Sequence, residues 1–278
     1  MKPVTKIQIA LLSGATLLIV LLLFANTTPP AKLDQAKQSE HSHVSNSSID
    51  AIVEDVKKAL SNEQKQAVEK LETALTAATD RETALQALTN HWSTVLKQPL
   101  VAAYYSEQAA LATLKEQNWV NAGNRYYTAS RFAKETEKTI VFNKAINCFE
   151  KAIALNPANV ESKISLAACY VEGSTEPMKG IGMLREIEKT DSNNVNLQLN
   201  FAFFSERSRQ FEKAIKRFDK VLVLKPDFIE AYLHLADAYE QMGDKQKAIE
   251  SLEKYISLID DASIKKEIKD YINKLKNS

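Results

Sequence analysis

The sequence predicts an all-α protein built from repeated helical hairpins, and three observations support this. Glycine and proline are scarce, with 6 and 7 in 278 residues, whereas a β-sandwich or a doubly wound α/β fold of this length needs many tight turns. The chain is instead rich in Ala, Leu, Lys, Glu and Gln, which favour helices. Small and large hydrophobic residues also recur about every 34 residues in its second half.

Charge and cysteine content exclude several classes of function. The 36 basic and 35 acidic residues leave a net charge of +1, so nothing attracts a polyanion over the whole surface and we expect no nucleic-acid partner. Two cysteines, Cys148 and Cys169, are too few for a disulfide framework or a zinc site. We expect both to be small buried hydrophobic residues.

The N-terminus carries an apolar run from Ile7 to Phe24 without charge or proline. As a helix it would span roughly 27 Å, close to the thickness of a bilayer core. Lys2 and Lys6 precede it, which favours an N-terminus inside the cytoplasm. Residues 1–25 are therefore predicted to be an uncleaved signal-anchor, a single transmembrane helix in the inner membrane. A cleaved signal peptide is the alternative, although its apolar region is usually shorter. Both interpretations place the bulk of the chain in the periplasm or outside the cell.

Two segments follow before the repeats begin. Residues 26–48 are polar and contain Pro-Pro, which predicts a flexible linker. Its His41 and His43 lack the further ligands that a metal site needs. Residues 49–115 carry hydrophobic stripes at helical spacing, but no 34-residue register is apparent. Degenerate repeats and a packed helical bundle both remain open for this N-terminal helical region.

The repeats themselves carry small and large residues at fixed offsets. Pairs of residues 34 positions apart are Ala214 and Ala248, Ile215 and Ile249, Phe218 and Leu252, and Ala202 and Ala236. A further unit opens with the stretch WVNAGNRY from Trp119 to Tyr126. Small residues let two antiparallel helices approach closely, and large ones fill the space between neighbouring hairpins. No hairpin can bury its apolar side alone, so the units must stack.

This pattern resembles the tetratricopeptide repeat (TPR), in which an aromatic residue, a Leu-Gly pair and a Tyr lie on the first helix. Ala, Phe, Ala and Pro follow on the second helix. The predicted array covers residues 116–262, with units at 116–159, 160–194, 195–228 and 229–262, and residues 263–278 form a capping helix. About ten extra residues lie within positions 132–143 of the first unit. Arg209 replaces the turn glycine of the third unit, which predicts a slightly different turn, and Asp260 replaces the closing proline of the fourth.

The resemblance implies a right-handed superhelix whose inner groove is lined by the first helix of each hairpin. The groove positions of the family fall here on Asn121, Asn124, Tyr127, Ile164, Leu199, Asn200, Phe203, Arg207, Leu233, His234 and Asp237. Such a surface of amides and apolar side chains can take an extended peptide or a helix. Some family members clamp a C-terminal carboxylate with lysines. Those lysine positions are Val120, Ile164, Leu199 and Leu233 here, which argues against such a clamp.

No motif for catalysis, a metal or a cofactor frames the remaining residues. The segment Gly180-Ile-Gly182 lacks a third glycine and falls at the small position of a repeat, so it indicates helix packing rather than phosphate binding. We therefore expect a non-enzyme: a membrane-tethered scaffold or assembly factor that binds a protein or peptide partner outside the cytoplasm. A self-associating structural spacer, and thus a homo-oligomer, is the first alternative. An enzyme with an unrecognised site in residues 49–114 is the second.

Overall fold

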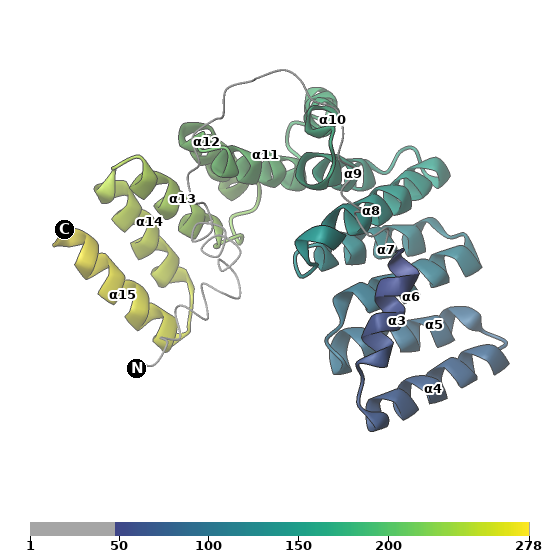
Figure 1. The fold of residues 1–278 in the computed structure, drawn as a ribbon. Coiled ribbons are helices and arrows are strands. Elements are labelled where there is room, and N and C mark those ends of the chain that lie inside the picture. Colours follow the sequence, from purple (N-terminus) through teal and green to yellow (C-terminus); the bar gives the residue numbers. More distant parts are fainter. Residues whose placement is uncertain (1–47, 278) are drawn as a thin grey trace, which may run out of the picture. The chain divides into compact units, whose positions relative to one another are not determined.

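The computed structural model describes residues 48–277, whose helices are joined by short turns and loops and which contain no strand. They divide into two compact units at residue 191, the N-terminal unit (residues 48–190) and the C-terminal unit (residues 191–277) (Figure 1). The N-terminal unit comprises α3 Ile49–Lys58, α4 Asn62–Ala77, α5 Arg81–Asn90, the π-helix η2 His91–Val95, α6 Pro99–Thr113, α7 Glu116–Ala129, α8 Glu135–Leu155, α9 Val160–Gly173 and α10 Pro177–Thr190. The C-terminal unit comprises α11 Val195–Arg207, α12 Phe211–Leu224, α13 Ala231–Gln241, α14 Lys245–Leu258 and α15 Ala262–Lys276.

The all-α prediction is confirmed, but the transmembrane helix in the predicted fold class requires a correction. No helix in residues 48–277 is both long and apolar enough to cross a membrane. The longest, α8, has 21 residues, yet charged side chains such as Glu137, Lys144 and Glu150 recur along it. The segment 7–24, on which this prediction rested, lies outside the described residues, as do residues 26–47 of the predicted linker. The right-handed superhelix and the domain boundaries stay predictions.

Helices of the N-terminal unit pack mainly against their neighbours in sequence. The helix pairs α5–α6, α6–α7, α7–α8, α8–α9 and α9–α10 are all in contact, and α3 packs on α6. Side-chain caps begin several of these helices, since Ser61 accepts from the Gln64 backbone N–H and Asn159 from that of Ser162. Trp119, Tyr126 and Phe149, which carry the repeat pattern, are buried together in one core. The repeat signature is therefore the core of this unit.

The hairpin of α5 and α6 shows why the region before residue 116 has no visible register. Its first helix continues into η2, where a wider turn takes up an extra residue. Lys97 then reverses the chain with φ at 55°, and the Gln98 N–H reaches back to the Trp92 carbonyl at 2.8 Å. An added residue shifts every later position by one. The hairpin is thus formed although its sequence pattern is interrupted.

The extra residues of the first predicted unit form helix rather than loop. They extend α8 to 21 residues, where α12 and α14 have 14 each. Seven residues make about two helical turns. Gly173, at the end of α9, lies against this extension: a Cβ on it would meet Phe142 Cγ at 1.8 Å. The glycine therefore leaves the room that the Phe142 ring occupies.

The C-terminal unit repeats one hairpin and ends on a single helix. The pairs α11–α12, α12–α13, α13–α14 and α14–α15 are in contact, and Ala202, Ala214 and Ala248 are buried at the close approaches. In α15, Ile268, Ile272 and Leu275 pack against α13 and α14 residues. Asp261 caps this helix by accepting from two backbone N–H groups. Its outer side carries lysines, which suits the solvated end of a helical array.

The turns of the two C-terminal hairpins are alike, so the prediction of a different turn at Arg209 is wrong. Arg209 has φ at 59° and Gly243, 34 residues later, has φ at 79°. The Gln210 N–H bonds to the Ser205 carbonyl at 2.8 Å, and the Asp244 N–H bonds to the Tyr239 carbonyl at 2.8 Å. The chain keeps the left-handed turn and places an arginine in a conformation that glycine adopts at lower cost.

Candidate functional site

The predicted groove residues of the N-terminal unit lie on α7 and α9. Asn121 and Asn124 are exposed on α7. Tyr127 is half-buried, and its hydroxyl donates to Glu172 Oε1 at 2.8 Å. Burial and the Glu172 carboxylate raise the pKa of Tyr127, so it remains a neutral donor. Ile164 on α9 is only 2% exposed, so it supports its neighbours rather than offering surface of its own.

The predicted residues of the C-terminal unit lie on α11 and α13. Leu199, Asn200, Phe203 and Arg207 are on α11, and Leu233, His234 and Asp237 are on α13. The structure brings Phe203 and His234 together, with ring centroids 5.1 Å apart, and His234 stacks on Phe218 at 4.9 Å. Phe203 remains 36% exposed. We name this aromatic cluster, Phe203, Phe218 and His234, the C-terminal patch.

Acidic side chains lie beside the C-terminal patch. The side chain of Glu206 is buried, and its Oε1 lies within hydrogen-bond distance of His234 Nδ1, at 3.3 Å. Burial, with the nearby Glu206 charge, raises the pKa of Asp237 to about 6. Glu206 was not among the predicted groove residues. The first-helix surface of this unit is therefore aromatic and acidic.

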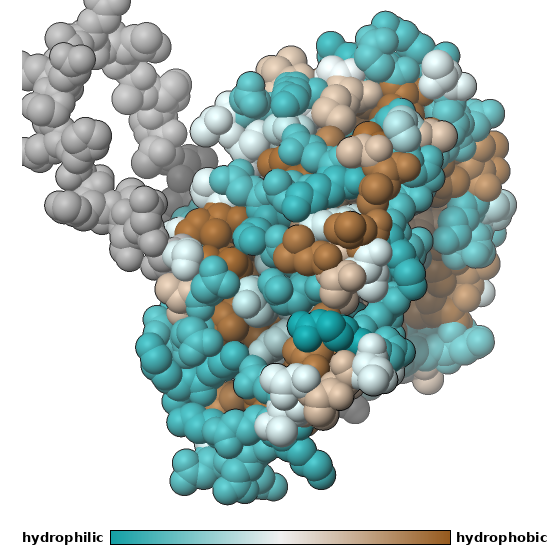
Figure 2. All heavy atoms as spheres, turned by 90° about the vertical axis from the view of Figure 1, so that its right-hand side faces the viewer, coloured by the Kyte–Doolittle hydropathy of each residue, from teal (hydrophilic) through white to brown (hydrophobic). Residues whose placement is uncertain are grey.

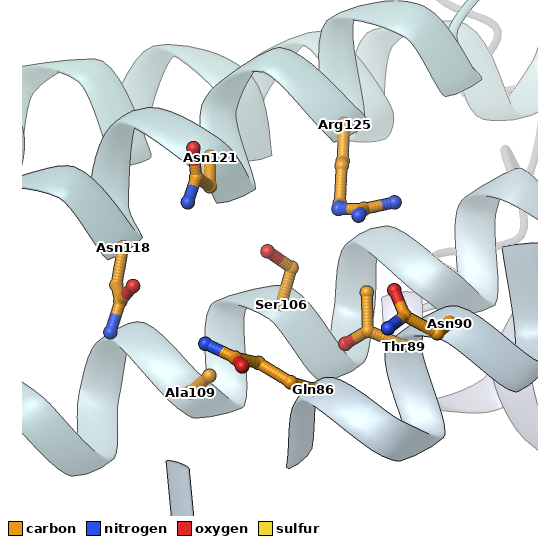
Figure 3. A pocket seen from close by; sticks show the side chains of 8 residues that line it. All are labelled: Gln86, Thr89, Asn90, Ser106, Ala109, Asn118, Asn121 and Arg125. Carbon is orange, nitrogen blue, oxygen red and sulfur yellow. The ribbon is translucent and has the colours of Figure 1, made fainter. Parts of the chain in front are cut away.

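A polar cavity of about 190 Å³ lies in the N-terminal unit between the first helices α5 and α7. Figure 3 shows its side chains converging from three helices, with α6 below. We name it the Arg125 pocket, and its lining residues are Gln86, Thr89, Asn90, Ser106, Ala109, Asn118, Asn121 and Arg125. No carboxylate belongs to this lining. The predicted groove residue Asn121 is part of it.

Arg125 is the one charged residue of the lining. Among residues 48–277 no carboxylate forms an ion pair with its guanidinium, which is half-buried. Burial alone lowers the pKa of Arg125 from its usual value, and a guanidinium remains protonated at neutral pH regardless. The pocket therefore presents an uncompensated positive charge on a concave polar surface.

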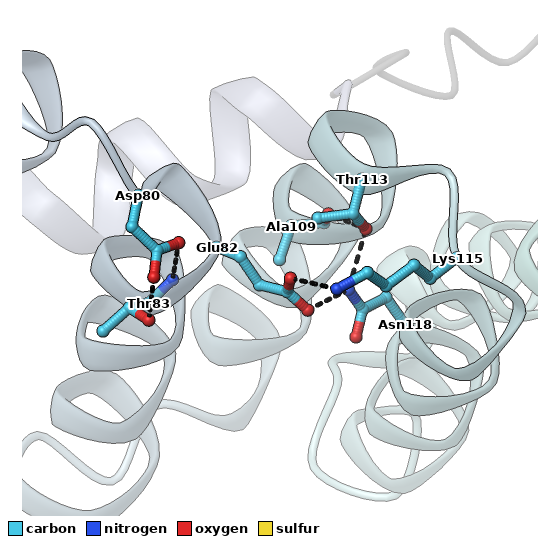
Figure 4. A network of polar contacts seen from close by, with 7 residues as sticks. All are labelled: Asp80, Glu82, Thr83, Ala109, Thr113, Lys115 and Asn118. Carbon is cyan, nitrogen blue, oxygen red and sulfur yellow. Dashed lines mark hydrogen bonds and ion pairs between the residues drawn. The ribbon is translucent and has the colours of Figure 1, made fainter.

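A carboxylate network fixes one end of the Arg125 pocket (Figure 4). The Asn118 amide donates to Glu82 Oε1 and to Thr113 Oγ1, both at 2.8 Å, and Lys115 Nζ lies 2.6 Å from Glu82 Oε2. These hydrogen bonds lower the pKa of Glu82. Glu116, 34 residues after Glu82, accepts in the same manner from the Asn156 and Asn159 amides. The lining residue Asn118 is thus held in place before any ligand arrives.

Sequence reasoning missed most of the Arg125 pocket. Gln86, Asn90 and Ser106 come from the segment in which no register was found. Arg125 follows a predicted groove position directly, but nothing in a single sequence shows that it lacks an acidic partner. The 34-residue spacing of Glu82 and Glu116 was the available signal that α5 and α7 hold equivalent places.

Metal-binding clusters and the two cysteines were the other candidate groups in the described part of the chain. No cluster of three His, Cys, Asp or Glu that could hold a metal occurs in residues 48–277. The thiols of Cys148 and Cys169 are buried. Burial raises the pKa of Cys148 to about 12 and raises that of Cys169 as well, so both thiols are unreactive. On the face that Figure 2 presents, hydrophobic side chains form separate patches among hydrophilic ones.

Comparison with known proteins supports the repeat. A family profile described as Tetratricopeptide repeat matches residues 142–159, and one described as Regulator of microtubule dynamics protein 1-3 matches residues 198–276. No curated protein matches the sequence.

Two solved structures are similar to this chain, and the first agrees with it at the level of the fold. A tetratricopeptide repeat protein from Parabacteroides merdae is 16% identical with a TM-score of 0.54, covering 82% of this chain and 86% of that one. YrrB, described as a TPR protein with an unusual peptide-binding site, is 18% identical with a TM-score of 0.42, covering 73% and 99%. The helical hairpins and the matched repeat together show that the chain has a tetratricopeptide-repeat fold.

Proposed function

We propose that the chain is a non-catalytic scaffold that binds a protein or peptide partner on its first-helix face. Each unit has its own first-helix face, which we define as the exposed surface of α5 and α7 in the N-terminal unit and as that of α11 and α13 in the C-terminal unit. The observation that carries the proposal is the Arg125 pocket, which gathers polar side chains from three helices around one unpaired guanidinium. Helix surfaces kept only for solubility have no need of such a concave, uncompensated site.

Two further features support this proposal. Asn121, which lines the pocket, and Asn124 are both exposed on α7, and primary amides can both donate to and accept from a peptide backbone. Phe203 exposes an aromatic side chain on the first-helix face of the C-terminal unit, and aromatic residues are enriched where proteins bind one another. Helical-repeat scaffolds of this fold generally bind proteins through such exposed helix surfaces.

Site-specific photo-crosslinking in living cells tests the proposal. A photo-reactive amino acid replaces Asn124 on α7 or, as a matched control, Asn147 on α8; both asparagines are exposed and belong to the same hairpin. We expect a discrete crosslinked partner with the reactive group at position 124 and none at position 147. Equal crosslinking at both positions would contradict the proposal. Crosslinks between two copies of the chain would instead favour the self-associating spacer.

The location of this scaffold outside the cytoplasm stays a prediction from residues 1–25, which lie outside the described residues. Its test is the protease sensitivity of a C-terminal tag in cells whose cytoplasm is sealed. We expect the tag to be digested without lysis. A tag that is digested only after the cytoplasmic membrane has been broken would contradict this location.

A further inference from the structure

The Arg125 pocket has the properties of a receptor for one negatively charged group. Its lining is rich in hydrogen-bond donors: the guanidinium of Arg125, the amides of Gln86, Asn90 and Asn121, and the hydroxyl of Ser106. We propose that the pocket binds a carboxylate of the partner, with Arg125 as the charged anchor. This inference rests on the proposed function, because it names the chemistry that the first-helix face recognises in its partner.

The charge of the pocket favours a carboxylate over a phosphate. Arg125 is the single charged residue of the lining, so one carboxylate balances it one to one. A phosphate group of nearly two negative charges would be only half neutralised. The planar guanidinium also matches the two oxygens of a carboxylate in a bidentate pair. The charge count and the geometry of the donor therefore point to the same ligand group.

Several donors in the pocket are free to turn toward a ligand. The Asn121 carboxamide oxygen accepts from the Gln117 amide at 3.0 Å. The NH₂ group of Asn121 takes no part in that bond and can donate to a ligand. The hydroxyl of Ser106 lies at the bottom of the pocket, and this residue is only 7% exposed. In Figure 3 the Ser106 oxygen points into the space between Asn121 and Arg125. A buried hydroxyl with room beside it is suited to donate to an incoming oxygen.

The pocket has room for the group and is held in shape by its surroundings. A volume of about 190 Å³ equals roughly six water molecules at about 30 Å³ each, which exceeds what a carboxymethyl group needs. Asn118 is fixed by Glu82 and Thr113. Tyr126, next to Arg125, donates to the buried Glu107 at 2.6 Å. Because these contacts exist without a ligand, little ordering is needed on binding.

This pocket differs from the carboxylate clamp of the TPR family. The clamp positions hold Val120 and Ile164 in this unit, and neither lines the Arg125 pocket. The pocket instead lies between two first helices, above Ser106 and Ala109 of α6. It can accept either an acidic side chain within a chain or a C-terminal carboxylate. Both sources present the same group, so the experiment must separate them.

The test measures peptide binding to the full chain in mild detergent, by fluorescence polarisation. The labelled probes are four acetylated pentapeptides: Ala-Ala-Glu-Ala-Ala with an amidated C-terminus, its Gln counterpart amidated, the Gln counterpart with a free C-terminus, and a phosphoserine counterpart amidated. We expect one of the two carboxylate peptides to bind about tenfold more tightly than the neutral amide. That peptide identifies the source of the carboxylate. No preference over the neutral peptide, or tighter binding of the phosphoserine peptide, would overturn the proposal.

Variants connect the preference to the pocket. Arg125→Gln should remove the carboxylate preference, whereas Arg125→Lys should retain part of it because the charge stays but the bidentate geometry is lost. Arg185→Gln is the matched control, since Arg185 is exposed on α10 and does not line the pocket. Circular dichroism at 222 nm establishes that all variants are folded. A carboxylate preference that survives in folded Arg125→Gln would overturn the assignment.

Failure of this inference can be distinguished from failure of the proposed function. If Arg125→Gln leaves peptide binding unchanged while a reactive group at position 124 still crosslinks a partner, the carboxylate assignment is wrong and the scaffold function stands. If no partner crosslinks at position 124 but the carboxylate preference depends on Arg125, the pocket is a receptor for another carboxylate ligand and the proposed function fails.

Discussion

The first-helix faces of the two units are built on the same hairpin but carry opposite chemistry. In the N-terminal unit α5 and α7 surround an unpaired Arg125 with amides and hydroxyls, and no carboxylate lines the pocket. In the C-terminal unit α11 and α13 bring Phe203 and His234 together beside the acidic Glu206 and Asp237. The two units carry similar residue types at the positions that pack, whereas they carry different residue types at the exposed positions.

This difference shows which residues the fold determines. Gly123, Ala202 and Ala236 are buried at equivalent places in their hairpins, because two helices can approach closely only over small side chains. Arg125 and Asp237, by contrast, face away from the close approach and can vary without disturbing it. Repeat architecture therefore separates stability from recognition within each helix.

The largest effect should come from the buried ion pair of the N-terminal unit. Lys144 Nζ lies 3.0 Å from both oxygens of Glu107, whose side chain is 6% exposed. Lys144→Met leaves this carboxylate with Tyr126 alone, so we expect a loss of about 3 kcal/mol in the free energy of unfolding, measured with urea. The double variant with Glu107→Gln should recover part of the loss. A single variant as stable as the wild type would show that water already screens the pair.

Close packing of α9 on α10 is the next property to test, and two glycines of α10 form a matched pair. A Cβ on Gly180 would lie 2.3 Å from the Ala167 carbonyl oxygen, whereas one on Gly182 would meet nothing within 4 Å. Gly180→Ala should cost about 1–3 kcal/mol, and Gly182→Ala should gain about 0.5–1 kcal/mol through helix propensity. Thermal unfolding measures both. Equal effects in the two variants would contradict the packing described for this hairpin.

The acidic character of the C-terminal unit predicts a pH dependence. The folded chain keeps the Asp237 proton up to about pH 6, whereas the unfolded chain releases it near pH 4. Between these values the folded state binds more protons, so the free energy of unfolding contributed by this group falls as pH rises and stays low above pH 6. Glu206, His234, Glu240 and Gln241 are the groups that act on Asp237.

The substitution Asp237→Asn should therefore change the free energy of unfolding more favourably at pH 7.5 than at pH 4. We expect the difference between the two pH values to be roughly 1–2 kcal/mol. Urea unfolding of the wild type and the variant at both pH values measures the difference. A benefit that is larger at pH 4 than at pH 7.5 would reverse the sign and contradict the raised pKa. The lining of the Arg125 pocket in the N-terminal unit has no carboxylate, so substitutions there should change the free energy of unfolding equally at both pH values.

The smallest effect concerns the hairpin turn of the C-terminal unit. Arg209 occupies the left-handed conformation that Gly243 adopts in the next hairpin. Arg209→Gly removes the steric cost but increases the freedom of the unfolded chain, so a net gain of about 0.5–1 kcal/mol is expected. Gly243→Arg should lose a similar amount. A melting temperature that falls in Arg209→Gly or rises in Gly243→Arg would contradict the equivalence of the two turns.

Sequence patterns predicted the part of this molecule that hydrophobic packing controls. The all-α class, the hairpins after residue 116 and the capping helix follow from small and large residues at fixed spacing. The α5–α6 hairpin remained unassigned because η2 takes up an extra residue and interrupts that spacing. The turn at Arg209 was predicted wrongly because tertiary packing of the hairpin overrides the preference of one residue. The transmembrane helix of the predicted fold class does not occur among the described helices.

The candidate sites were predicted less completely, for a physical reason. First-helix positions such as Asn121, Phe203 and His234 follow from the repeat alone. The pocket around Arg125 needs side chains from three helices, and two of them, α5 and α6, lie outside the recognised repeats. Whether a charge has a partner depends on tertiary contacts, which no spacing along one sequence reveals.

The most direct test of the first-helix face is quantitative capture of the crosslinked partner by two hydrophobic-to-acidic variants of one hairpin. Phe203 on α11 is 36% exposed on the first-helix face, and Val223 on the second helix α12 is 80% exposed. We predict that Phe203→Glu loses most of the partner and that Val223→Glu retains it, with both variants folded by circular dichroism. Equal capture of the same protein by the wild type and both variants would contradict the role of this face.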